Sequence, residues 1–102
     1  MNSSILIDMN KEGVSDAAGR VQGIVVMNNI VQLYNEKKPS RIILDFTNVT
    51  YITSGLAKEL FGGLYKAFGT SMQEIIGIRI GKDNDILKAT ILRALSTVIT
   101  KK

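Results

Sequence analysis

The sequence predicts a small α/β domain in which strands and helices alternate along the chain. Short blocks rich in β-branched residues, typical of strands, are separated by longer stretches whose apolar residues recur at helical spacing. The chain has 102 residues, of which 45% are hydrophobic and 22% charged, so it can build one core and has the balance of a soluble globular protein. The order β-α-β-α-β-α favours a small parallel or mixed sheet covered by helices. We expect a single domain over residues 1–102.

Three apolar blocks predict the strands. They are Ile5–Ile7, Arg41–Phe46 and Ile75–Ile80. The second block is almost continuously apolar, which is typical of a central strand that is buried on both faces. A sheet of this size keeps at least one exposed edge, and such an edge can pair with a second copy of the chain, so homo-oligomerisation stays open.

The stretches between and after these strands predict three helices. Their expected ranges are 16–36, 55–68 and 85–99. Ser15 is placed to cap the first helix, and Gly69 is placed to end the second. The third helix can be capped by Asn84 or by Asp83.

Each helix is expected to bury one apolar face. The expected buried residues are Ala17, Val21, Ile24, Val25, Val31 and Tyr34 in the first helix; Leu56, Leu60, Leu64 and Ala67 in the second; and Ile86 or Leu87, Ile91, Ala94, Leu95 and Val98 in the third. The pairs Gly19-x-x-x-Gly23 and Gly62-Gly63 fit neither dinucleotide-binding nor P-loop spacing. We expect these glycines to mark close contacts between helices.

The residue types argue against an enzyme. Histidine and cysteine are both absent, which removes the commonest general base, the usual zinc ligands and the thiol nucleophile. The carboxylates are spread over different predicted elements and form no spaced pair for acid–base catalysis; they include Asp8, Asp45, Glu59, Asp83 and Asp85. We therefore expect no catalytic residue, no metal ligand and no cofactor.

Composition and charge limit the cellular location of the protein and the class of partner that it can bind. No apolar run reaches the roughly 18 residues that span a bilayer, and residues 1–4 lack the features of a signal peptide. With no cysteine, the chain fits a reducing compartment, so we expect a cytoplasmic protein with no membrane contact. The net charge of +4 leaves a basic nucleic-acid-binding domain as the alternative function, although the cations are scattered and only 6% of residues are aromatic.

The segment 47–55 is the most informative for function. It follows the predicted central strand, and functional groups in α/β folds gather just beyond the carboxyl ends of strands. Thr53 and Ser54 stand where the second helix begins, so either hydroxyl can cap free N–H groups of that helix. A phosphate on either residue would instead add negative charge at the positive end of the helix dipole and change the surface offered to a partner.

The same segment resembles a known family. Residues 44–56 are LDFTNVTYITSGL, which resembles the signature of STAS domains, the fold of bacterial anti-sigma-factor antagonists. Residues 57–64 continue as AKELFGGL. This continuation is more similar to a STAS-like family of unknown function, whose members carry a Ser-Phe-x-x-Glu-x-Phe-Gly-Gly-Leu pattern here.

The resemblance implies a STAS-like fold and places Thr53 at the phosphoacceptor position of the antagonists, with Ser54 as the alternative acceptor. Ser54, Gly55 and Leu56 match the next three positions of the signature. Ile52 is a departure, because it replaces an aspartate that belongs to the kinase-facing surface of the antagonists.

By the same resemblance, we expect a bacterial signalling module that works by binding another protein. The implied partner is a GHKL-type kinase or ATPase, or another regulator. The implied partner-binding residues are Thr50, Ile52, Thr53, Ser54, Gly55, Lys58 and Glu59.

Overall fold

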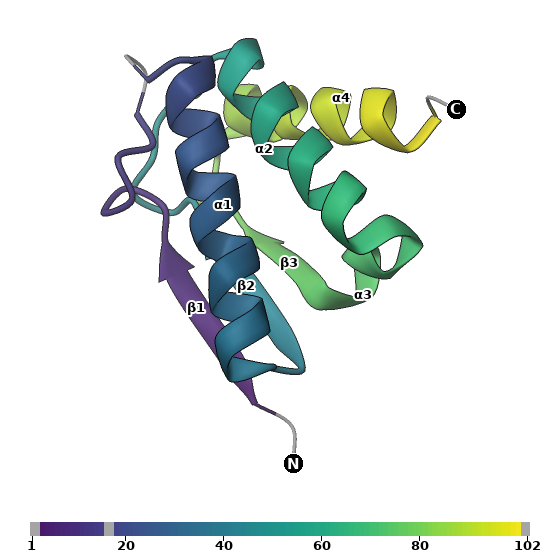
Figure 1. Ribbon diagram of the computed structural model, residues 1–102. Coiled ribbons are helices and arrows are strands. Elements are labelled where there is room, and N and C mark those ends of the chain that lie inside the picture. The colour runs from purple at the N-terminus through teal and green to yellow at the C-terminus, as the bar shows by residue number, and fades with distance from the viewer. Residues whose placement is uncertain (1–2, 16–17, 101–102) are drawn as a thin grey trace.

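The three strands form one sheet in which neighbouring strands are parallel (Figure 1). The computed structural model describes residues 3–15 and 18–100. β1 (Ser4–Asp8), β2 (Arg41–Asp45) and β3 (Ile76–Arg79) lie in the order β1-β2-β3. α1 (Arg20–Lys37) follows β1, α2 (Ser54–Phe68) follows β2, and α4 (Asp85–Thr100) follows β3. The structure confirms the predicted α/β class. Of the two predicted alternatives, a parallel or a mixed sheet, the sheet is parallel.

The sheet buries one face and leaves much of the other open. In register, Ile5 lies beside Ile42, and Ile42 beside Ile76. This row belongs to the face covered by α1 and α2, which lie in front of the sheet in Figure 1, and Ile42 is fully buried. Leu6 and Arg41 point to the opposite face and are exposed, Leu6 by 51%. β2 is central as predicted, but its predicted burial on both faces is wrong, because α4 packs against α2 and leaves the second face open.

The start of α1 differs from the prediction. The predicted first residues of this helix, 16–17, lie outside the described part of the chain, and the helix begins at Arg20. Gly19 occupies the N-cap position and has no side chain that could accept a hydrogen bond. The predicted cap at Ser15 is therefore wrong.

The buried face of α1 also differs. Its buried residues are Gly23, Val26 and Ile30, whereas Val21, Ile24 and Val25 of the predicted face are exposed. Val31 and Tyr34 are partly buried against the core, as expected. Consecutive apolar residues run right round this part of the helix, so their spacing alone does not select the face that packs.

The buried faces of α2 and α4 follow the prediction closely. Leu56, Leu60 and Leu64 of α2 and Leu87, Ile91 and Ala94 of α4 are all buried. Ala67, predicted to be buried in α2, is exposed. In α4, Ile86 is 70% exposed, so Leu87 is the core residue of these two alternatives. Within the described residues, none of the helices is both long enough and apolar enough to cross a membrane.

Both of these helices have identifiable caps. Asn84 caps α4, because its Oδ1 accepts the N–H of Leu87 at 3.2 Å. The other candidate, Asp83, stands outside the helix with a positive φ of 66°. Gly69 ends α2 as predicted: its φ is +62° and its N–H donates to the carbonyl of Tyr65.

One short element is absent from the sequence prediction. A single 3₁₀ turn (Gly69–Ser71) and α3 (Met72–Ile75) connect α2 to β3. Ile75, predicted as the first strand residue, therefore ends a helix. A helix of one turn carries too few residues to show a periodicity, and the burial of Met72 in the core supports it.

The main contact between helices is the close approach of α1 and α2 at glycine positions. A Cβ on Gly23 would lie 2.7 Å from the carbonyl oxygen of Leu56, and one on Gly63 would lie 2.6 Å from the Met27 side chain. Gly62 has only an ordinary contact, with Val98 at 3.9 Å. The expected close packing thus holds at Gly23 and Gly63 only.

Replacing Gly23 with alanine should lower the free energy of unfolding by about 2 kcal/mol, because the new methyl group would force the two helices apart. Gly62→Ala is the matched control: it removes a helical glycine without a clash, so it should raise the free energy of unfolding by about 0.5–1 kcal/mol. Urea unfolding measures both values. Equal effects of the two substitutions would contradict the tight contact at Gly23.

Candidate functional site

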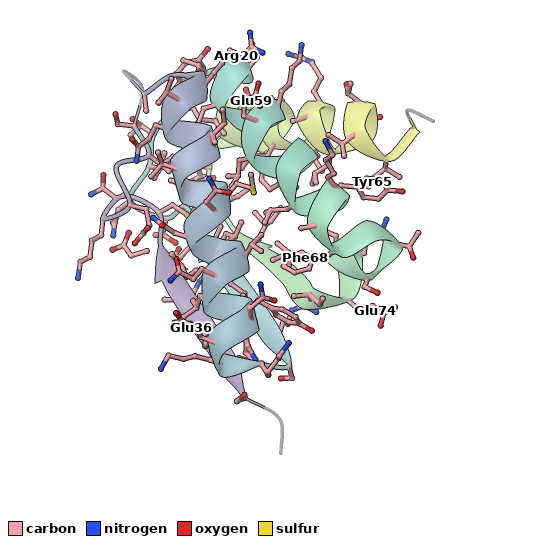
Figure 2. The ribbon with its side chains drawn as sticks, in the orientation of Figure 1. Arg20, Glu36, Glu59, Tyr65, Phe68 and Glu74 are labelled. Carbon is pink, nitrogen blue, oxygen red and sulfur yellow. The ribbon has the colours of Figure 1, made fainter. Side chains whose placement is uncertain are left out.

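The loop 46–53 lies at one end of the molecule, beside the first turns of α1 and α2. Arg20 in α1 and Glu59 in α2 mark this end in Figure 2, whereas Glu36 and Glu74 lie toward the opposite end. The loop leaves the carboxyl end of β2 and enters α2. The site predicted from the sequence is therefore at the edge of the sheet where α/β folds usually place function.

Asp45 ends β2 and shapes the start of this loop. Its Oδ1 accepts hydrogen bonds from the hydroxyl of Thr47 and from the Thr47 backbone N–H, the latter at 3.0 Å. These two hydrogen bonds, with a smaller contribution from the charge of Arg79, hold the pKa of Asp45 below its ordinary value. The carboxylate is ionised at neutral pH, and its stabilising contribution is lost only as the pH falls through its lowered pKa.

Asn84 ties the loop to α4. Its Nδ2 donates to the carbonyl oxygens of Val49 and Thr50, each at 3.2 Å. Since its Oδ1 caps α4, one side chain holds both the loop backbone and the start of a helix. The sequence indicates the cap but not the loop contact, because Val49 and Thr50 lie far from Asn84 along the chain.

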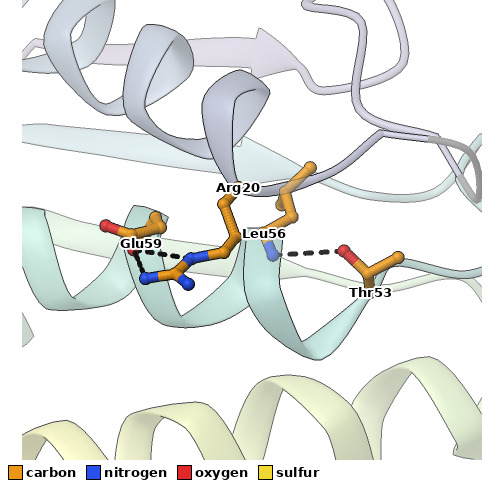
Figure 3. A network of polar contacts seen from close by, with 4 residues as sticks. All are labelled: Arg20, Thr53, Leu56 and Glu59. Atoms are coloured by element: carbon orange, nitrogen blue, oxygen red, sulfur yellow. Dashed lines mark hydrogen bonds and ion pairs between the residues drawn. The ribbon is translucent and has the colours of Figure 1, made fainter.

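Thr53 is the N-cap of α2, as predicted. Its Oγ1 accepts the N–H of Leu56 at 3.1 Å (Figure 3) and donates to the carbonyl of Ala18 at 3.0 Å. The hydroxyl therefore both donates and accepts a hydrogen bond.

The neighbouring Ile52, predicted as part of the partner-binding surface, is fully buried. Its side chain belongs to the core and lies beneath that surface, so it cannot contact a partner directly.

A surface ion pair joins the first turns of α1 and α2. Arg20 Nε and Nη2 donate to Glu59 Oε2 at 3.1 and 2.9 Å (Figure 3). The arginine passes over Gly55, where a Cβ would come within 2.8 Å of Arg20 Cγ. Two predicted site residues, Gly55 and Glu59, thus belong to this contact. The sequence does not indicate Arg20 as their neighbour, because only the packing of the two helices brings it there.

The exposed part of the predicted surface consists of Thr50, Ser54 and Lys58. Ser54 and Lys58 line a shallow hollow of about 100 Å³ between α2 and α4, together with Thr90, Arg93, Ala94 and Thr97. Ser54 therefore shares this hollow with two cationic residues, Lys58 and Arg93, whereas the hydroxyls of Thr90 and Thr97 donate to backbone carbonyls of α4. In residues 3–15 and 18–100, no cluster of His, Cys, Asp or Glu is placed to hold a metal ion.

Two substitutions should separate the roles of Asn84. Asn84→Asp keeps the oxygen that caps α4 but loses the donors to the loop, so we expect it to cost about 1 kcal/mol of unfolding free energy. Asn84→Ala loses both and should cost about 2–3 kcal/mol. Urea unfolding at moderate salt compares them. If the aspartate variant were as stable as the wild type, the loop carbonyls would not depend on Asn84.

Comparison with known proteins identifies the family to which the chain belongs. No curated protein and no solved structure matches the chain. A family model described as a STAS-like domain of unknown function (DUF4325) matches residues 22–81, which run from the start of α1 to just beyond β3. The matched part includes β2, the loop 46–53 and α2, the same segment that carries the sequence resemblance. Since the match covers more than half of the chain, the protein belongs to the family of STAS-like domains.

Proposed function

We propose that this protein is a non-enzymatic bacterial signalling module that resembles an anti-sigma-factor antagonist and binds a GHKL-type kinase or ATPase through the start of α2. The observation that carries the proposal is the exposure of Thr50, Ser54 and Lys58 at the carboxyl edge of the sheet, on a backbone fixed from two sides. Membership of the STAS-like family supports the class of function. The proposed location is the cytoplasm.

The anchoring of the loop supports a role in binding. Asn84 holds the loop from α4, and the Thr53 hydroxyl holds its end to the chain before α1. A surface that is ordered before it meets its partner loses less conformational entropy on binding. The Arg20–Glu59 pair adds exposed charge at the rim, since the arginine is 75% exposed.

We further propose that phosphorylation regulates this surface and that Ser54 is the acceptor. The resemblance places Thr53 at the acceptor position, but the Thr53 hydroxyl is engaged as the cap of α2. Ser54 is exposed, and it shares its hollow with Lys58 and Arg93. A phosphate on Ser54 would lie at the positive end of the α2 dipole with Lys58 and Arg93 nearby, so the fold would accommodate it while the local positive charge was neutralised.

Phosphorylation should therefore depend on Ser54. After incubation with the kinase and ATP, the intact mass of the wild type should increase by one phosphate, and Ser54→Ala should show no increase. Thr53→Ser keeps the capping hydroxyl and should remain a substrate, whereas Thr53→Ala should lose about 1 kcal/mol of stability while Ser54 is still modified. A phosphate that persists in Ser54→Ala would refute this assignment.

Partner binding should depend on the first turns of α2 and not on its end. We expect Lys58→Glu to abolish capture of the kinase or ATPase from native lysate, identified by mass spectrometry. Lys66→Glu is the matched control, because it makes the same charge change on an exposed residue in the last turn of the same helix. Equal capture by both variants would place the binding surface elsewhere. If the material captured from the lysate is lost on nuclease treatment, the result would instead favour the nucleic-acid-binding alternative.

A further inference from the structure

We propose that a phosphate on Ser54 is held within the same chain by Lys58 of α2 and Arg93 of α4, which together form a phosphate clamp between the two helices. This inference rests on the proposed function, in which Ser54 is the phosphoacceptor, and it specifies how the modification acts. The clamped phosphate neutralises two cations that a partner would otherwise meet, and it ties α2 to α4.

The hollow between α2 and α4 has room for the phosphate. Ser54 lines this hollow and is exposed, so its hydroxyl is accessible to a kinase. The hollow measures about 100 Å³, which is the volume of about three molecules of liquid water. A phosphate group on Ser54 can therefore occupy it without displacing a side chain.

The hollow is cationic and has no carboxylate to balance its charge. Lys58 and Arg93 are its two charged residues, and none of its lining residues is an aspartate or a glutamate. Within residues 3–15 and 18–100, the single salt bridge joins Arg20 to Glu59, on the side of α2 that faces α1. A phosphate on Ser54 therefore meets two exposed cations that are not already held in an ion pair.

The two cations approach the phosphate from different helices. Lys58 lies four residues after Ser54 in α2, and side chains at this spacing are neighbours on one face of a helix. Arg93 belongs to α4 and lines the same hollow, so a phosphate held by both residues bridges the helices. The guanidinium presents its N–H donors as a fork that fits two phosphate oxygens, whereas the ammonium acts as a point charge.

The hydroxyl groups on the α4 side of the hollow are committed to their own helix. The Thr90 hydroxyl donates to the carbonyl of Ile86 at 3.1 Å, and the Thr97 hydroxyl donates to the carbonyl of Arg93 at 3.0 Å. Their hydrogen atoms are therefore not offered to a phosphate. On the α4 side, the clamp depends on the Arg93 side chain.

The clamp accounts for a switch on a surface whose backbone is already fixed. Lys58 belongs to the proposed partner-binding surface, and the loop before α2 is held by Thr53 and Asn84. The phosphate carries about −1.5 to −2 charges at neutral pH, which offsets the charge of both cations. A partner that presents acidic side chains to Lys58 and Arg93 therefore loses this attraction, although the loop keeps its conformation.

The titration of the phosphate tests the clamp. Phosphoserine is placed at position 54 during translation, and its phosphorus-31 NMR signal is followed against pH. The pKa of its second ionisation is ordinarily about 6, and we expect it to lie about 0.5–1 lower here because nearby cations favour the doubly charged form. Arg93→Gln and Lys58→Gln should each raise this pKa again, and Arg93→Lys should raise it less than Arg93→Gln. The α2 dipole acts in every variant, so the change caused by Arg93→Gln isolates the clamp.

Thermal unfolding provides a second readout of the clamp. At about pH 8 the phosphorylated protein should unfold about 3 °C higher than the unmodified protein, and Arg93→Gln should remove most of this gain. The same substitution should change the Tm of the unmodified protein by less than about 1 °C, because Arg93 is exposed. The part of the gain that depends on the second negative charge should disappear as the pH falls through the lowered pKa.

Lys88→Gln is the matched control for both readouts. Lys88 is an exposed cation of the same helix, but it lines a different hollow, beside β3, so its loss should change neither the phosphate pKa nor the gain in Tm. A phosphate pKa that Arg93→Gln leaves unchanged overturns the clamp. An equal effect of Lys88→Gln, or a phosphorylated protein no more stable than the unmodified one, also overturns it. Neither readout uses the kinase or the partner, so the clamp and the proposed function can fail separately.

Discussion

The architecture depends on the contact in which α1 packs against α2 at Gly23. The absence of a side chain there lets the helix approach the Leu56 carbonyl, and a Cβ would stand only 2.7 Å from that oxygen. The two helices then lie side by side over one face of the sheet, with their first turns at the same end. The Arg20–Glu59 pair and the bond from Thr53 to Ala18 both span this junction. They are consequences of the close approach, because neither could form between helices held further apart.

The parallel topology has a second consequence at the same end. Each strand in a parallel sheet delivers its following loop to the same edge, so residues distant in sequence meet there. Asp45 organises the turn after β2, and Asn84, which follows β3, holds the backbone of that turn. The polar groups of the site are thus largely paired with one another. What remains exposed, chiefly Ser54 and Lys58, is presented on a backbone with little freedom to move.

The sequence predicted the features that depend on local pattern, and it missed those that depend on packing. The strand blocks, the α2 face at Leu56 and Leu60, and the cap at Thr53 follow from short-range spacing and are confirmed. The predicted buried face of α1 was wrong because consecutive apolar residues do not single out one side of the helix. The side that packs is the one that carries Gly23, where α1 comes close to α2. Burial of β2 on both faces was wrong for a related reason: a run of apolar residues does not reveal where the last helix will pack. Arg93 joins the site only through that packing.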